Sequence, residues 1–173
     1  PKMNTGKVQA MHTSHAKEQT ENNTTSWIGC YPGNKKEISK GQTFLANSGG
    51  SLEGIEVLPT FVNQPAEVLL TIHDYDADTR KWGEQLGSAK VSISQSDCGK
   101  WIRFNIPNLQ LSKGKFYGFK LASHNSFIGV AEAVGSAKNP PLSEGREWKF
   151  EDNGDTDSFR YMSLAFKIAV KAA

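Results

Sequence analysis

Three aspartates alternate along one short segment and form the most distinctive group of chemically active side chains in the sequence: Asp74, Asp76 and Asp78. Carboxylates that converge from a loop can bind a hard cation such as calcium, which takes several oxygen ligands. The segment departs from the helix–loop–helix calcium loop, because Thr79 stands where that loop needs glycine and Gln85 replaces its closing glutamate. The pattern favours a hairpin tip, where aspartate promotes turns, and structural calcium at these three residues is the alternative.

Tryptophans supply a second candidate chemistry, because flat aromatic rings bind the C–H faces of sugars while neighbouring polar groups bind hydroxyls. Trp82 and Trp148 lie in charged segments without the alternation of a buried strand, so we expect both in loops, as exposed platforms. The nearby Arg80 and Arg146 would donate hydrogen bonds to carboxylates or hydroxyls, which predicts an acidic or heavily hydroxylated sugar. The alternative is that these tryptophans fold back over the edge of a core.

A third candidate surface lies in the segment 101–106, where apolar even positions alternate with odd positions that include Trp101 and Arg103. Successive side chains of a strand point to opposite faces, so burial of the even positions would expose Trp101 and Arg103 as a strip for a polar ligand. The alternative is that Trp101 covers the end of the fold.

Motifs of catalysis are absent from the sequence. It contains no nucleophile elbow, phosphate-binding loop or metalloprotease helix motif. His73, Ser123 and His124 could be grouped into a triad only by free choice. We therefore predict that the protein is not an enzyme, and a small hydrolase is the weakest of the alternatives.

Charge and composition narrow the classes of partner. The 173 residues carry 20 lysines and arginines against 18 acids, a net charge of +2. The basic residues are scattered, which argues against nucleic-acid binding, and the apolar runs are too short to span a bilayer. Cys30 and Cys98 both lie beside turn-forming residues, and the sequence leaves open whether they form a disulfide or remain thiols.

The segment from residue 52 to residue 121 reads as short strands separated by turn formers. Its alternating or apolar runs are Leu52–Leu58, Val68–Tyr75, Ser88–Ser94, Trp101–Ile106 and Phe116–Ala122. This spacing is typical of an antiparallel sandwich or barrel, and we predict an all-β sandwich of about eight to ten strands with negligible helix. One strong central strand is expected over Met162–Val170, because its apolar residues alternate with small or polar ones.

Two regions are expected along the chain: a polar N-terminal extension over residues 1–25, which could pair as an edge strand, and one sandwich domain over residues 26–173. The strand faces predict a core, whose members are Ile55, Val57, Leu70, Ile72, Val91, Ile93, Ile102, Phe104, Phe119, Leu121, Leu164 and Phe166.

The order of these segments is familiar. A strand that ends in Ile72-His73-Asp74 precedes Leu86-Gly87-Ser88, then Trp101-Ile102-Arg103-Phe104, then a strand preceded by Gly114 and leading into Tyr117. Over residues 42–170 this order resembles the jelly-roll domains appended to bacterial surface and secreted proteins, which are similar to carbohydrate-binding modules.

The resemblance implies a jelly-roll sandwich, an extracellular or cell-surface location, and a glycan as the partner. It also implies that structural calcium is a reasonable expectation, and we expect any export signal to precede Pro1. A non-catalytic carbohydrate-binding module is therefore the first expectation. A structural or adhesive protein-interaction domain without a glycan site, packed against a neighbouring domain, is the second.

Overall fold

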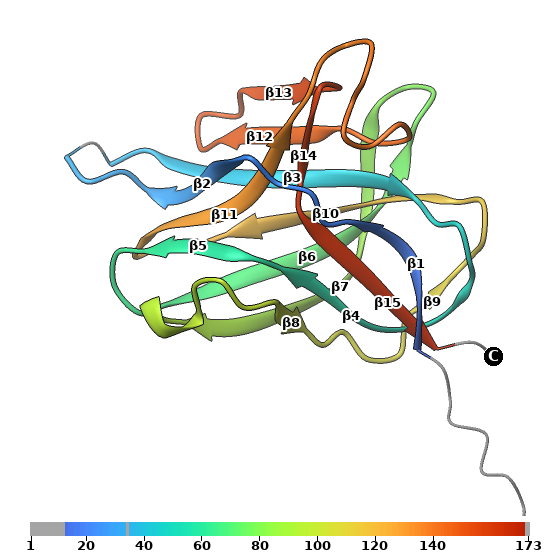
Figure 1. The fold of residues 1–173 in the computed structure, drawn as a ribbon, viewed down its shortest axis with the longest axis horizontal. Helices are drawn as coiled ribbons and strands as arrows, with labels where there is room; N and C mark the ends of the chain where they lie inside the picture. Colours follow the sequence, from blue (N-terminus) through green and yellow to red (C-terminus); the bar gives the residue numbers. More distant parts are fainter. Residues whose placement is uncertain (1–12, 34, 172–173) are drawn as a thin grey trace, which may run out of the picture.

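A computed structural model describes residues 13–33 and 35–171, and within them the chain is a sandwich of two antiparallel sheets (Figure 1). Helix is confined there to the 3₁₀ turn Gln95–Asp97, and no helix of this part of the chain is long and apolar enough to cross a membrane. The all-β sandwich predicted from strand spacing is confirmed.

The smaller sheet has the order β1-β15-β4-β8, with β9 paired to β4. Its strands are β1 Thr13–Gln19, β4 Gly50–Val57, β8 Ile102–Phe104, β9 Gln110–Leu111 and β15 Phe166–Lys171. β1 thus lies within the segment expected as an extension, on the edge of this sheet, where it pairs with β15.

The larger sheet follows the order β14-β11-β2-β3-β10-β6-β7, with β12, β13 and β5 joined to its side. Its strands are β2 Thr24–Cys30, β3 Glu37–Leu45, β5 Pro59–Val62, β6 Ala66–Asp76, β7 Lys81–Ile93, β10 Phe116–Ala122, β11 Phe127–Val134, β12 Glu147–Glu151, β13 Thr156–Phe159 and β14 Met162–Leu164. The described residues hold more strands than expected because several are short additions to the predicted ones.

The last predicted strand is in fact two strands in different sheets. β14 pairs with β11 in the larger sheet, whereas β15 pairs with β1 and β4 in the smaller one. Ala165 lies between them, and its N–H donates to the carbonyl of Ala131 at 2.9 Å. The expectation of one continuous strand over Met162–Val170 is therefore wrong. Apolar and polar residues alternate both before and after Ala165, and this alternation does not show that the two halves join different sheets.

Apolar faces of the two sheets meet in one core, and ten of the twelve predicted core residues are buried in it. Val91 and Ile102 are only partly buried against it, because they lie on the edge strands β7 and β8. The predicted faces of segment 101–106 are confirmed, since Phe104 and Ile106 are buried while Arg103 is exposed.

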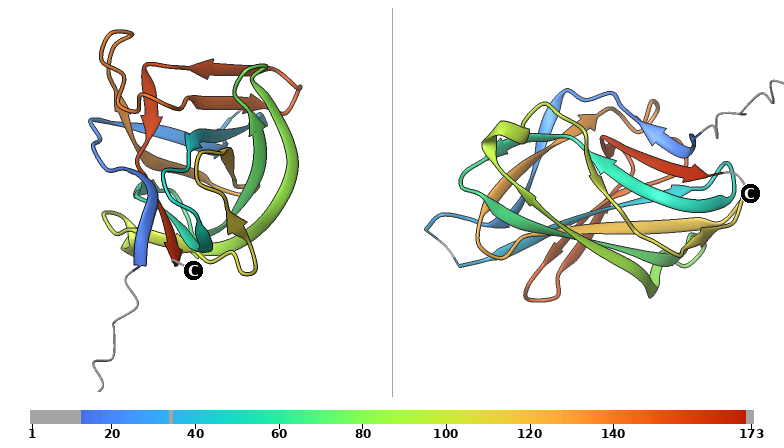
Figure 2. Two further views of the ribbon diagram at one scale, coloured as in Figure 1. Left: turned by 90° about the vertical axis from the view of Figure 1, so that its right-hand side faces the viewer. Right: turned by 90° about the horizontal axis from the view of Figure 1, so that it is seen from below.

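The long strands β6 and β7 bend away from the core. In the left view of Figure 2 the green hairpin that they form curves toward the orange-red strands β12 and β13. β10 lies between β3 and β6, so that Gly118 pairs with Thr43 on one side and His73 on the other. The β6–β7 hairpin and the strands β12 and β13 thus approach each other beside the face of the larger sheet that points away from the core.

Candidate functional site

A second aromatic cluster packs on this outer face, separate from the sandwich core. Trp82 of β7 and Trp148 of β12 meet edge to face, with ring centroids 5.7 Å apart. Tyr75 contacts both indoles at 5.8 and 5.9 Å, and Phe150 stacks on Trp148 at 6.1 Å. Such edge-to-face and offset pairs are favourable beyond the area they bury. We call these four residues the outer aromatic cluster.

Two glycines allow the cluster to lie close to the sheet. A Cβ atom at Gly118 would overlap the six-membered ring of Trp82, and one at Gly41 would stand 3.2 Å from Cη2 of the same indole. Both glycines are buried, on the neighbouring strands β10 and β3. The indole of Trp82 therefore rests on bare backbone, which fixes its position.

Lys120 covers part of the cluster. Its Nζ lies 4.9 Å from the ring centroid of Trp82 and 4.3 Å from that of Phe150, within cation–π range. Burial lowers the pKa of this lysine. His73 lies edge-on to Trp82 at 5.6 Å, and its pKa is also lowered, chiefly by burial and then by the charge of Lys120.

The structure brings Trp82 and Trp148 together but corrects their expected setting. Neither is in a loop: Trp82 is the second residue of β7 and Trp148 the second of β12. Trp148 is 6% exposed and Trp82 is half-buried. The expectation of an exposed platform is therefore wrong for Trp148, because this strand buries its apolar side chains in the outer cluster rather than in the sandwich core.

An open surface pocket of about 180 Å³ adjoins the outer aromatic cluster at Tyr75. Its lining residues are Thr43, Tyr75, Ala77, Phe116, Ser143, Glu144, Gly145, Arg146 and Arg160. We call it the Tyr75 pocket. Two other surface pockets, of about 590 and 370 Å³, are lined by no phenylalanine, tyrosine or tryptophan.

Strand and loop backbone hold the pocket wall in place. The backbone N–H of Arg146 donates to Oγ1 of Thr43 at 3.0 Å, and the N–H of Thr43 donates to the carbonyl of Arg146. Nη1 of Arg146 donates to Oγ of Ser158 at 3.4 Å. This reciprocal pair ties the segment before β12 to β3, so the Arg146 side chain starts from a fixed position.

Positive charge gathers around this pocket. Arg160 and Arg146 both line the pocket. Burial lowers the pKa of Arg146 most, and the charges of Arg80 and Arg160 lower it further. The one acid in the lining, Glu144, lies 3.6 Å from Nζ of Lys17. Burial raises the pKa of Tyr75, which keeps its hydroxyl protonated, while the charges of Arg146 and Arg80 oppose the shift.

Of the three aspartates for which calcium binding was the alternative to a hairpin tip, Asp74 and Asp76 have separate partners. Asp74 contacts Nζ of Lys115 at 2.7 Å, an ion pair that raises the pKa of the lysine. Oδ1 of Asp76 accepts the backbone N–H groups of Asp78 and Thr79, at 2.9 and 3.2 Å. These bonds close the hairpin turn, and no group of three or more metal-ligating side chains lies among the described residues.

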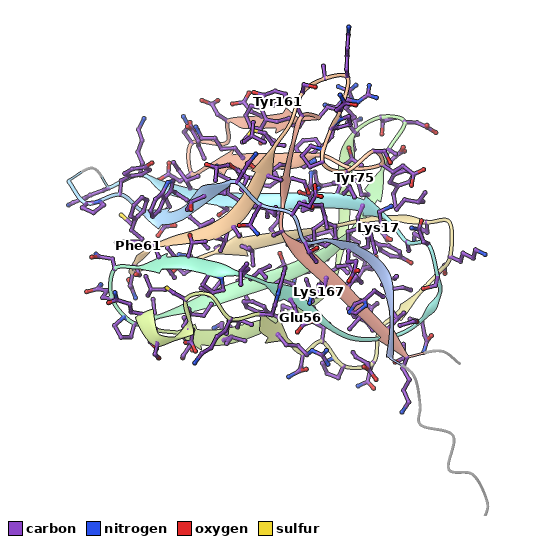
Figure 3. The ribbon with its side chains drawn as sticks, in the orientation of Figure 1. Lys17, Glu56, Phe61, Tyr75, Tyr161 and Lys167 are labelled. Atoms are coloured by element: carbon purple, nitrogen blue, oxygen red, sulfur yellow. The ribbon has the colours of Figure 1, made fainter. Side chains whose placement is uncertain are left out.

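Trp101 and Arg103 lie on the other sheet, apart from the Tyr75 pocket. Nζ of Lys167 stands 4.4 Å from the ring centroid of Trp101, and Arg103 lies 3.7 Å from a carboxylate oxygen of Glu56. Figure 3 shows Glu56 and Lys167 together at the lower centre and Tyr75 at the upper right. Both residues of the expected strip therefore already contact charged side chains, Arg103 that of Glu56 and Trp101 that of Lys167.

The side chains considered for a triad remain separate. The ring of His73 bonds Oγ1 of Thr71 at 2.8 Å, and that of His124 lies 3.2 Å from the Glu37 carboxylate. Oγ of Ser123 donates to the carbonyl of Glu67. Each group has a different partner, so no nucleophile–base pair forms among them. Cys30 and Cys98 are likewise not joined by a disulfide.

Sequence reasoning missed Tyr75 and Arg160 as pocket residues. Tyr75 closes the predicted strand Val68–Tyr75, and the alternation of that strand places it with His73 on the outer face, opposite Trp82. Arg160 follows β13 in a turn whose position depends on the β12–β13 hairpin. Alternation along a strand does not identify either residue as part of a pocket, because the pocket depends on which strands meet in space.

A separate row of aromatic rings was missed as well. Trp27 and Phe127 stack at 4.6 Å with nearly parallel rings, and Phe61 and Tyr31 extend the row at its two ends. Phe61 is 43% exposed and Tyr31 39%. We call these four residues the aromatic row; Phe61 marks it on the left of Figure 3, far from Tyr75 in that view.

Comparisons with known proteins give a fold likeness and no family. No protein-family model and no curated protein match the sequence. A crystal structure of the cysteine protease and lectin-like domains of Cwp84, a surface-layer associated protein of Clostridium difficile, matches with a TM-score of 0.51 and 14% identity. A structure of the clostridial cysteine protease Cwp84 after propeptide cleavage matches with a TM-score of 0.52 and 12% identity.

These matches cover 80% and 86% of this chain but only 32% and 40% of the Cwp84 chains. The sandwich resembles the lectin-like domain of that surface protein, and at such low identity the likeness shows the fold alone. The sequence-based resemblance to domains of bacterial surface proteins is confirmed at this coarser level.

Proposed function

We propose that this chain is a non-catalytic glycan-binding module of a cell-surface or secreted protein, and that the sugar binds in the Tyr75 pocket. The observation that carries the proposal is the combination found there: aromatic rings, the Ser143 hydroxyl, and two guanidinium groups that pair with no carboxylate of the described residues, in one open hollow. Sugar sites join these features, because apolar rings bind C–H faces while polar groups fix the hydroxyls. The lectin-like fold of a surface protein supports the same reading.

Each pocket residue has a role that follows from its setting. Tyr75 and Phe116 line the hollow with aromatic rings, and the exposed Ser143 offers a hydroxyl. Thr43 is buried, and its hydroxyl is used to hold Arg146. Arg146 donates from a backbone position fixed by Thr43. Trp82 and Trp148 contribute indirectly, because their rings hold Tyr75 in place from behind.

The test is retention on immobilised polysaccharides, read by affinity electrophoresis of the intact chain. Arg146→Gln should lose retention on the polysaccharide that holds the wild-type chain, without a lower melting temperature. Arg103→Gln, on the other sheet, is the matched control and should be retained as the wild type. Equal retention of both variants would remove the pocket from the account, and failure of the wild type on a broad panel would remove the function.

A protein-interaction module is the second candidate, favoured by the aromatic row. Large exposed rings are enriched where proteins meet. Phe61→Ala would then weaken binding to the neighbouring domain, whereas Arg146→Gln would leave that binding unchanged.

A further inference from the structure

The strongest unexplained feature of the Tyr75 pocket is its charge. Arg146 and Arg160 line the hollow, and Arg80 acts on Arg146 through its charge. Among the residues the structure describes, no carboxylate lies within ion-pair distance of any of the three, although six other ion pairs form there. Arginines grouped without acids repel one another, which costs stability.

Two acids near the pocket are engaged elsewhere. Glu144 contacts Lys17, and Asp76 accepts backbone N–H groups of its own hairpin turn. Neither neutralises the guanidinium groups. Arginines that repel one another in an open hollow are typical of a binding site, where the ligand supplies the missing negative charge.

We infer that the Tyr75 pocket holds an anionic group of the sugar, a carboxylate or a sulfate, through Arg146 and Arg160 with Arg80 at the rim. This inference rests on the proposed function and narrows the ligand to acidic glycans. A guanidinium group fits a carboxylate or sulfate because its parallel N–H groups can donate two hydrogen bonds at once. The protonated hydroxyl of Tyr75 and the hydroxyl of the exposed Ser143 line the same hollow and can bind the neighbouring sugar hydroxyls.

Two matched pairs of probes share a sugar backbone and differ in whether it carries acidic groups. Trigalacturonate and its methyl ester test the carboxylate, and dextran sulfate and dextran test the sulfate. Calorimetry at low salt should give the acidic member of at least one pair about tenfold tighter binding than its neutral partner. The preference should shrink as salt rises, since salt screens exposed charges.

Variants test whether the preference for the acidic probe arises in the Tyr75 pocket. Arg146→Gln and Arg160→Gln should each remove most of it, whereas Arg103→Gln, a charge loss on the other sheet, should keep it. Arg146→Lys should keep only part of the preference, because an ammonium group lacks the paired donors. Melting temperatures check that each variant remains folded.

The outcomes separate this inference from the proposed function. Equal affinity for acidic and neutral sugars, with both weakened by Arg146→Gln, would overturn the anion site and leave the glycan module standing. If no sugar binds, a rise in melting temperature with inorganic sulfate that Arg146→Gln abolishes would support the anion site, and no rise would overturn it. Polyglutamate bound as tightly as trigalacturonate through the same arginines would overturn the assignment to glycans.

Discussion

The indole of Trp82 rests on the backbone of Gly118, so closely that a Cβ atom at residue 118 would overlap the ring. Trp82 lies on β7 and Gly118 on β10, and β6 lies between these two strands in the larger sheet. Trp82 in turn contacts Tyr75, so this contact supports the wall of the pocket.

Gly118→Ala should therefore displace Trp82 and destabilise the fold by about 1–3 kcal/mol, the usual cost of overpacking. Urea unfolding measures the loss. In a Trp82→Ala background the added methyl group has room, and the same change should cost much less. Additive losses in the double variant would show that the indole and Gly118 are not coupled.

Trp148→Ala should cost about 3–5 kcal/mol, as for a large buried aromatic side chain. Trp148 is 6% exposed and contacts three other rings, whereas Trp101 is only partly buried under one lysine. The matched Trp101→Ala variant should lose clearly less stability in the same denaturant titration. Equal losses would mean that the outer cluster adds nothing to stability.

Glu147 makes stability depend on pH. Burial, together with the adjacent Glu132 carboxyl, raises the pKa of Glu147 from 4.5 to about 10. The unfolded chain releases this proton near pH 4.5 while the folded chain keeps it, so this group lowers stability progressively as pH rises from about 4.5 toward 10.

Glu147→Gln removes the proton uptake and keeps a neutral polar group of the same shape. It should raise the free energy of unfolding at pH 8 by about 1 kcal/mol or more and flatten its pH dependence. Glu53→Gln, a change at a partly exposed carboxylate on the other sheet, controls for net charge. A Glu147→Gln variant less stable than the wild type at pH 8 would contradict the buried acid.

The sequence predicts those strands of the fold that bury apolar side chains on one face. The predicted segment Phe116–Ala122, whose apolar side chains enter the core, matches β10 residue for residue. The first half of β7 was missed because its residues Lys81–Gln85 are mostly exposed on an edge strand. Without burial on one face, a strand carries no alternation.

The site was predicted only in part for the same reason. The charged surroundings of Trp82 and Trp148 marked the correct region, but they read as loops because the apolar partners come from β6 and β12 rather than from the core. That Trp101 faces the opposite way, on the other sheet, follows from sheet order, which local sequence does not encode.

The most direct measurement of the central claim is a ¹⁵N–¹H titration of the intact chain with trigalacturonate, following the indole N–H signals. The four tryptophans report on three separate places: Trp82 and Trp148 beside the Tyr75 pocket, Trp27 in the aromatic row, and Trp101 on the other sheet. The account predicts that the Trp82 signal shifts saturably, with the Arg146 and Tyr75 amides, while Trp27 and Trp101 stay unchanged. Shifts confined to Trp27 or Trp101, or no shift with trigalacturonate and none in the same titration with dextran sulfate, would contradict it.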